Sequence, residues 1–129
     1  MASAIEGIVP LLLALVLAAC GRTVSDIEGE WQGQDQSAVQ FEMSLSEDGG
    51  AVSGAGTYNI SGPRPTGTFQ VRGTFGPPSV ALLFTYDNGT RATFNGTLET
   101  SSRLGGRKTY TTRSGEVRSE TIMFFRIAR

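Results

Sequence analysis

The chain has 129 residues, which is enough for one domain with one hydrophobic core. Charged residues make up 18% of the sequence and the formal net charge is -1, which excludes a disordered polyelectrolyte and argues against nucleic-acid binding. The chain has no histidine and one cysteine, which excludes histidine-based catalytic triads and metal sites, thiolate zinc sites and an intramolecular disulfide.

The first predicted element is a signal peptide over residues 1–19. Residues 8–19 form an apolar run that no charge interrupts and that ends at Cys20. A bilayer-spanning helix needs about 20 apolar residues, so this run is too short to span, and it has the length of the apolar core of a secretory signal. The alternative is a buried helix with Cys20 as a small apolar side chain, although the rest of the chain predicts no helix to pack against it.

The sequence at the end of this run, Leu17-Ala18-Ala19-Cys20, resembles the lipobox of bacterial lipoproteins. The resemblance implies cleavage before Cys20, a diacylglycerol on the Cys20 sulfur and an acyl chain on the new amino group. It also implies a lipid-anchored protein of the bacterial cell envelope. Because Gly21 and not aspartate follows the cysteine, the expected location is the outer membrane if the organism has one. Residues 20–26 then form the acylated cysteine and a tether.

Residues 27–129 are predicted to form one β domain. Apolar and polar residues alternate with a period of two, which is typical of strands with one buried and one solvated face. The expected strands are residues 27–33, 39–46, 52–60, 68–75, 80–86, 91–99, 107–112 and 119–127. The last strand is apolar on both faces over residues 122–125, so its register stays open.

Short turns separate these strands, and Asn88-Gly89 is the clearest hairpin signal because a type I′ turn needs positive φ at both central positions. A sandwich and a barrel both fit the regular spacing. The barrel is favoured because closure removes the two sheet edges that a meander leaves. The expected fold is therefore all-β, an antiparallel up-and-down meander of about eight strands closing into a small barrel.

The first strand carries Gly29-Glu30-Trp31, which resembles the Gly-x-Trp near the start of lipocalins and avidins, the calycin-type barrels. In those families the tryptophan plugs one barrel end near a basic side chain from a late strand. The resemblance therefore implies that Trp31 and Arg126 close the barrel. The plainer interpretation makes Trp31 the largest core side chain, and we favour it over ligand contact.

Ligand contacts are expected inside the barrel if it holds a cavity. Many aromatic residues fall on the inward rows, which predicts a mostly filled interior. Gly54, Gly56, Gly73 and Gly96 lie on the same rows and either leave room for a ligand or relieve crowding in bent strands, the second being favoured. Trp31, Tyr58 and Tyr86 are the candidate ligand-binding residues, the two tyrosines because they combine an aromatic ring with a hydroxyl.

Catalysis is not expected. The one lysine, Lys108, lies on a polar strand that is predicted to be solvated, which argues against a lysine base. The neighbouring carboxylates Glu28 and Glu30 are predicted to lie on a solvated strand face, which argues against a glycosidase pair. No metal site and no cofactor are predicted. Basic residues of the late strands form either a patch for anionic partners or a solvated face paired with the acidic first half of the chain (Arg103, Arg107, Lys108, Arg113, Arg118).

Three functions remain open. The first is a non-enzymatic envelope lipoprotein, anchored to the membrane through Cys20, whose barrel binds a small apolar ligand or an envelope protein. The second is a periplasmic protease or lysozyme inhibitor that acts through loops such as Ser61 to Thr66. The third is a structural surface protein without a discrete ligand. The interior of the barrel and the loops at its ends discriminate between them.

Overall fold

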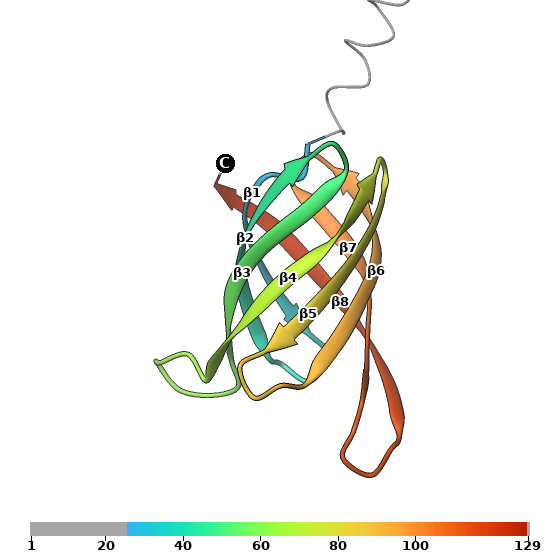
Figure 1. Ribbon diagram of the computed structural model, residues 1–129. Coiled ribbons are helices and arrows are strands. Elements are labelled where there is room, and N and C mark those ends of the chain that lie inside the picture. Colours follow the sequence, from blue (N-terminus) through green and yellow to red (C-terminus); the bar gives the residue numbers. More distant parts are fainter. Residues whose placement is uncertain (1–25, 129) are drawn as a thin grey trace, which may run out of the picture.

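The computed structural model describes residues 26–128, which form a closed antiparallel β-barrel (Figure 1). Each strand pairs with the next along the chain, and the last pairs with the first. This confirms the predicted up-and-down barrel. The signal peptide expected over residues 1–19 and the lipidation site Cys20 lie outside the described residues. The strands are β1 (Gly29–Asp35), β2 (Gln40–Asp48), β3 (Ala51–Asn59), β4 (Gly67–Gly76), β5 (Ser79–Tyr86), β6 (Arg91–Thr100), β7 (Arg103–Thr111) and β8 (Val117–Ala128).

The last two strands correct the sequence-based expectations. β7 begins at Arg103 and not at residue 107, because Leu104 is fully buried and extends the inward row. In β8 the apolar run resolves into two faces, with Ile122 and Phe124 buried and Phe125 half exposed on the outer wall. The register follows from the pairing of Gly33 with Phe124 across β1 and β8.

The middle of the barrel is filled by phenylalanine rings. Neighbouring rings in this cluster lie with centroids 5.2 to 6.5 Å apart, mostly edge to face or tilted, as aromatic pairs prefer. The predicted filling of the interior by aromatic side chains is thus confirmed. The rings come from strands all round the barrel (Phe41, Phe69, Phe84, Phe94, Phe124).

Two inward glycines lie directly beneath these rings. Gly56 pairs with Phe69 across β3 and β4, and a Cβ atom at Gly56 would lie 2.6 Å from the Phe69 ring. Gly33 has the same relation to Phe124, again at 2.6 Å. The space that these glycines leave is therefore occupied by phenyl rings of the chain itself, and it is not open to a ligand.

The two ends of the barrel differ. The chain enters at Asp26 and leaves at Ala128 at one end, the upper end in Figure 1, where the short β2–β3, β4–β5 and β6–β7 turns also lie. We call this the closed end. The β1–β2, β3–β4, β5–β6 and β7–β8 loops lie at the opposite end, which we call the mouth.

Three of the mouth loops have the same turn geometry. In each, a backbone amide donates to the carbonyl three residues earlier, and the residue that closes the loop has positive φ. That residue is Ala38 in the first loop, Gly89 in the third and Gly115 in the fourth. A type I turn followed by a left-handed residue is a standard three-residue hairpin loop.

The type I′ turn expected at Asn88-Gly89 is therefore wrong, although the hairpin itself forms. Asn88 does not have positive φ, and its side-chain oxygen instead accepts the Thr90 amide at 3.0 Å. The two-residue loop with positive φ at both positions lies at the closed end, at Gly49 and Gly50.

Candidate functional site

A cavity of about 390 Å³ opens at the mouth, between the mouth loops and the phenylalanine cluster. We call it the cup. Its wall is largely aromatic and aliphatic, with charged side chains at its floor and rim. It is at the small end of the range for pockets that hold small molecules. The side chains that line it include Asp35, Phe41, Tyr58, Tyr86, Arg91, Lys108, Tyr110, Arg113 and Glu120.

The floor of the cup carries a buried ion pair. Lys108 Nζ donates a hydrogen bond of 2.7 Å to Asp35 Oδ2, and the two side chains are 7% and 1% exposed. The same ammonium lies 4.7 Å from the centre of the Phe41 ring and 5.4 Å from that of Tyr110. Because buried cations need such partners, the aromatic faces help to hold the charge in place. The expectation that Lys108 is solvated was wrong, because β7 turns this side chain inward.

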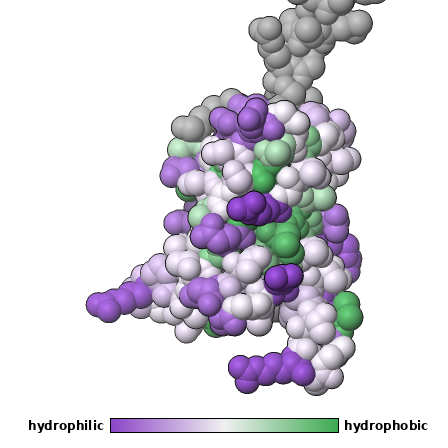
Figure 2. All heavy atoms as spheres, viewed as in Figure 1, coloured by the Kyte–Doolittle hydropathy of each residue, from purple (hydrophilic) through white to green (hydrophobic). Residues whose placement is uncertain are grey.

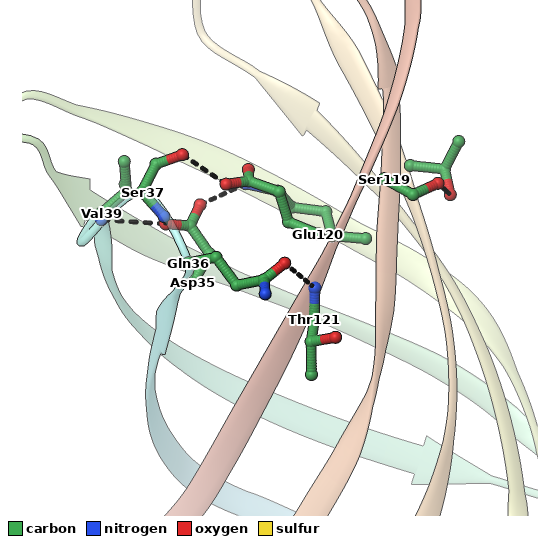
Figure 3. A network of polar contacts seen from close by, with 9 residues as sticks. Asp35, Gln36, Ser37, Val39, Ser119, Glu120 and Thr121 are labelled. Atoms are coloured by element: carbon green, nitrogen blue, oxygen red, sulfur yellow. Dashed lines mark hydrogen bonds and ion pairs between the residues drawn. The ribbon is translucent and has the colours of Figure 1, made fainter.

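Asp35 also builds the turn that positions it. Its Oδ1 accepts the backbone amides of Ser37 and Val39, each at 3.0 Å (Figure 3). These bonds hold Ala38 between them in a left-handed conformation that costs an L residue about 1 kcal/mol. The β1–β2 loop is therefore fixed by the same carboxylate that pairs with Lys108.

Glu120 on the neighbouring strand β8 is joined to this loop. Its Oε1 accepts a hydrogen bond from the Ser37 hydroxyl, and its Oε2 lies 3.9 Å from Lys108 Nζ. Beside it, Gln36 Oε1 accepts the Thr121 amide at 3.0 Å (Figure 3). The first and last strands are thus tied together at the mouth by side chains as well as by the barrel ladder.

Two of the predicted ligand-binding residues lie together in the wall of the cup. The rings of Tyr58 and Tyr86 meet edge to face with centroids 5.2 Å apart. The Tyr58 hydroxyl donates to Asp87 at 3.3 Å. Burial, and secondarily the charge of Asp35, raises the pKa of Tyr86, so its hydroxyl stays protonated at neutral pH. Both tyrosines line the same cavity, as a binding wall requires.

Trp31 lies outside the cup, at the closed end. It is fully buried, and its indole N–H donates to the Ile27 carbonyl at 3.0 Å. The Arg126 guanidinium stacks 4.4 Å from the indole ring and donates to the backbone carbonyls of Asp26, at 2.7 Å, and Glu28. The structure therefore brings Trp31 and Arg126 together at the closed end, where the chain enters the barrel.

The basic group of the late strands does not form one patch. Lys108 is inside the barrel, while Arg103 and Arg118 pair locally with Glu99 and Glu116 at 3.2 and 3.3 Å. Within residues 26–128 no group of three or more carboxylates or thiols is placed to hold a metal ion. No helix in the same part of the chain is long and apolar enough to span a bilayer.

Sequence reasoning missed the floor of the cup. Lys108 and Glu120 face each other across the β7–β8 hairpin, but nothing in the sequence links Asp35 on β1 to them. A signal was present in β7, because Lys108 falls on the same parity as Leu104 and Tyr110, the inward row. The expected strand began at residue 107, four residues after the observed start of β7. It therefore did not include Leu104, and the inward position of Lys108 was not recognised.

Comparisons with known proteins show the architecture. No protein-family model and no curated protein matches the sequence. One solved structure, described as a redesigned β-barrel, is similar to the chain with a TM-score of 0.62 and 19% identity. The alignment covers 81% of this chain and 95% of that one. At this identity the likeness shows the fold alone: the described residues form a small eight-stranded antiparallel β-barrel.

Proposed function

We propose that the protein is a non-enzymatic, lipid-anchored envelope protein of bacteria that binds a small molecule in the cup. The observation that carries the binding function is the cup itself, because it combines two tyrosines with a buried ammonium in one cavity. Ligand pockets typically have such apolar walls with a few convergent polar groups. The phenylalanine cluster below limits the ligand to the mouth end of the barrel.

The lipobox supports the lipid anchor. The fold determines which end of the barrel such an anchor would hold near the membrane. The described chain begins at Asp26 at the closed end, six residues after Cys20. An extended chain spans at most about 3.6 Å per residue, so an acylated Cys20 holds the closed end within about 20 Å of the membrane. The mouth then faces away from the bilayer, where a water-soluble ligand can enter it.

Ligand binding is tested on the protein reconstituted in lipid nanodiscs, screened by NMR against a library of small aromatic and aliphatic compounds. Tyr86→Ala should weaken any hit about tenfold, because it removes the ring that forms one wall of the cup. Leu83→Ala, on the outer wall of β5 three residues before Tyr86, is the matched control and should leave affinity unchanged. A screen without hits, or hits that Tyr86→Ala does not affect, would contradict the proposal.

The anchor is tested separately by metabolic labelling with radioactive palmitate. We expect label on the native protein and none on Cys20→Ala, together with release of that variant from the membrane fraction. Label that persists after the substitution would rule out Cys20 as the acylated residue. Because this experiment does not involve the cup, the anchoring and binding proposals can fail independently.

Inhibition of an envelope protease or lysozyme is the second candidate, and the shape of the mouth favours it over a purely structural role. The β3–β4 loop and the β7–β8 hairpin project beyond the barrel (Figure 1). Ile60 is 61% exposed at the base of the first of these loops. Replacing residues 61–66 with a short Gly-Ser loop should abolish inhibition and spare ligand binding, whereas Tyr86→Ala should do the reverse.

A further inference from the structure

The carboxylates in and beside the cup already accept hydrogen bonds from the protein. Asp35 accepts hydrogen bonds on both oxygens, from two backbone amides and from Lys108. Asp87 also accepts on both oxygens, from the Tyr58 hydroxyl and the Thr68 amide, each at 3.3 Å. A cationic ligand would therefore have to compete with bonds that the chain already makes.

Glu120 is the remaining carboxylate of the cup, and it is engaged in the same way. One of its oxygens accepts from Ser37, and the other faces the Lys108 ammonium at 3.9 Å. An ion pair with one lysine and a hydrogen bond from one hydroxyl leave it little attraction for a second cation. No carboxylate that lines the cup is without a donor in the part of the chain that the structure describes.

The donors of the cup, in contrast, have spare capacity. An ammonium has three N–H groups, and Lys108 makes one hydrogen bond, to Asp35, within residues 26–128. Its other N–H groups face Glu120 Oε2 at 3.9 Å, the rings of Phe41 and Tyr110, and the cavity. The Tyr86 hydroxyl makes no hydrogen bond to the described residues, and its raised pKa keeps the proton on it.

Two arginines complete this pattern at the rim. Arg91 begins β6 and Arg113 lies in the β7–β8 turn, and both line the cup. Both are exposed, and neither forms an ion pair with the residues that the structure describes. An arginine binds a carboxylate through its planar fork of donors. The rim thus offers two positive groups to whatever enters the mouth.

The charge distribution along the barrel points in the same direction. Carboxylates outnumber bases at the closed end, whereas acidic and basic side chains nearly balance at the mouth. Figure 2 shows hydrophilic tips on the two long loops of the mouth. The excess of carboxylates at the closed end repels anions there, which leaves the mouth as the more favourable end for an anion. The closed end carries Asp26, Glu28, Glu30, Glu47, Asp48 and Glu99 against Arg103 and Arg126, and the mouth carries Arg64, Arg91, Lys108, Arg113 and Arg118 against Asp35, Asp87, Glu116 and Glu120.

We propose that the ligand of the cup is a small aromatic monocarboxylate. Its carboxylate lies at the rim between Arg91 and Arg113, and its ring lies against Tyr58 and Tyr86. Lys108 and the Tyr86 hydroxyl donate to any acceptor atom on the inserted end of the ligand. This inference rests on the proposed small-molecule function and adds the charge and the orientation of the ligand.

The test compares three probes that differ in one group: phenylacetate, phenylacetamide and phenethylamine. Each is titrated into the nanodisc-reconstituted protein by calorimetry and by NMR. Phenylacetate should bind about tenfold tighter than the amide, and the amine should bind most weakly, because the donors of the cup match a carboxylate. The affinity for phenylacetate should fall as salt is raised, since the rim arginines are exposed to solvent.

Variants locate the carboxylate. Arg91→Gln and Arg113→Gln should each weaken phenylacetate binding about fivefold and leave phenylacetamide binding unchanged. Arg72→Gln, on the outer wall of β4 and away from the cup, is the control and should leave both affinities unchanged. These arginines are exposed and unpaired in the described residues, so the variants should fold as the native protein does.

The outcomes separate this inference from the function on which it rests. If the amine binds as tightly as the acid, or if both arginine variants bind phenylacetate normally, the anionic ligand is ruled out while small-molecule binding stands. If none of the three probes binds and the broader screen also finds no ligand, the proposed function and this inference fall together.

Discussion

Lys108 and Asp35 form a buried ion pair of 2.7 Å between residues that are 73 positions apart. The pair joins β7 to the end of β1 across β8, the one strand that lies between them. Asp35 belongs to the acidic first half of the chain and Lys108 to the basic second half. This ion pair connects the two halves of the chain, so the charge asymmetry of the sequence is expressed at a buried point.

Lys108→Met should lower the free energy of unfolding by about 3–5 kcal/mol, because Asp35 is then buried without its cation. The measurement is a urea titration of the Cys20→Ala protein followed by circular dichroism. Arg107→Met, at the next position of β7 but exposed, should change stability by less than about 0.5 kcal/mol. Equal effects of the two substitutions would show that the ion pair does not stabilise the mouth.

Ala38→Gly should stabilise the protein by up to about 1 kcal/mol. Ala38 has φ of 67°, a conformation that costs an L residue about 1–2 kcal/mol and glycine almost nothing. The reciprocal substitution is Gly89→Ala, at the equivalent position of the β5–β6 loop, which should destabilise by a similar amount. Thermal unfolding of both variants checks the prediction, and a change of the same sign in both would contradict it.

The fold was largely predictable from the sequence because period-two alternation carries it. In β2, buried Phe41, Met43 and Leu45 alternate with exposed residues, as the sequence pattern requires. Turn type was less predictable, since the Asn88-Gly89 pair suits two hairpin geometries and the pairing of the flanking strands decides between them. The inward positions of the glycines were predictable. The contact of the Phe69 ring with Gly56 was not, because it depends on the register between β3 and β4.

The cup was predictable only in part. Tyr58 and Tyr86 were identifiable because they lie on inward rows and carry hydroxyl groups. The floor was not, because Asp35, Lys108 and Glu120 meet only after the barrel closes β8 against β1. Lys108 is the one lysine of a polar strand, and no local feature of the sequence shows whether its side chain points inward or to solvent. The buried residue Leu104, on the same face of β7, shows that it points inward.

Gly56→Ala should destabilise the barrel by about 1–3 kcal/mol, because the new methyl group meets the backbone carbonyl of Glu42 and, at 2.6 Å, the Phe69 ring in a packed core. Gly76→Ala is the matched control in the next strand, where a Cβ atom has no neighbour within 4 Å and φ is not positive. It should change stability by less than about 0.5 kcal/mol. A destabilising effect of Gly76→Ala equal to that of Gly56→Ala would mean that strand propensity, and not the phenyl ring, sets the requirement.

Arg126→Met should loosen the closed end. The guanidinium donates to the backbone carbonyls of Asp26, Glu28 and Ser101 while it stacks on Trp31, and methionine keeps the apolar stem without these donors. Hydrogen exchange should increase at residues 27–31 and stay unchanged in the mouth loops. Arg103→Met, which removes a surface pair with Glu99, is the control. Unchanged exchange at residues 27–31 would show that Trp31 is held by packing alone.

The stability of the barrel should fall above pH 10, with Tyr86 as a main contributor. Burial raises the folded-state pKa of Tyr86 above the ordinary value of 10.0 that the unfolded chain has. Below pH 10 both states keep the proton, so Tyr86 adds no pH dependence. Above it the unfolded chain loses the proton first, and the free energy of unfolding falls by at most about 1.4 kcal/mol per pH unit.

Tyr86→Phe isolates this effect, because the lost hydroxyl makes no hydrogen bond to the described residues and stability at pH 7 should change little. Urea titrations of both proteins between pH 8 and about pH 12 give the two slopes, and tyrosinate absorbance follows ionisation directly. We expect a shallower decline for Tyr86→Phe, with the remainder from Tyr58, whose pKa burial and Asp87 also raise. Identical declines in the two proteins would place the ionisation elsewhere and would show that the cup wall is open to water.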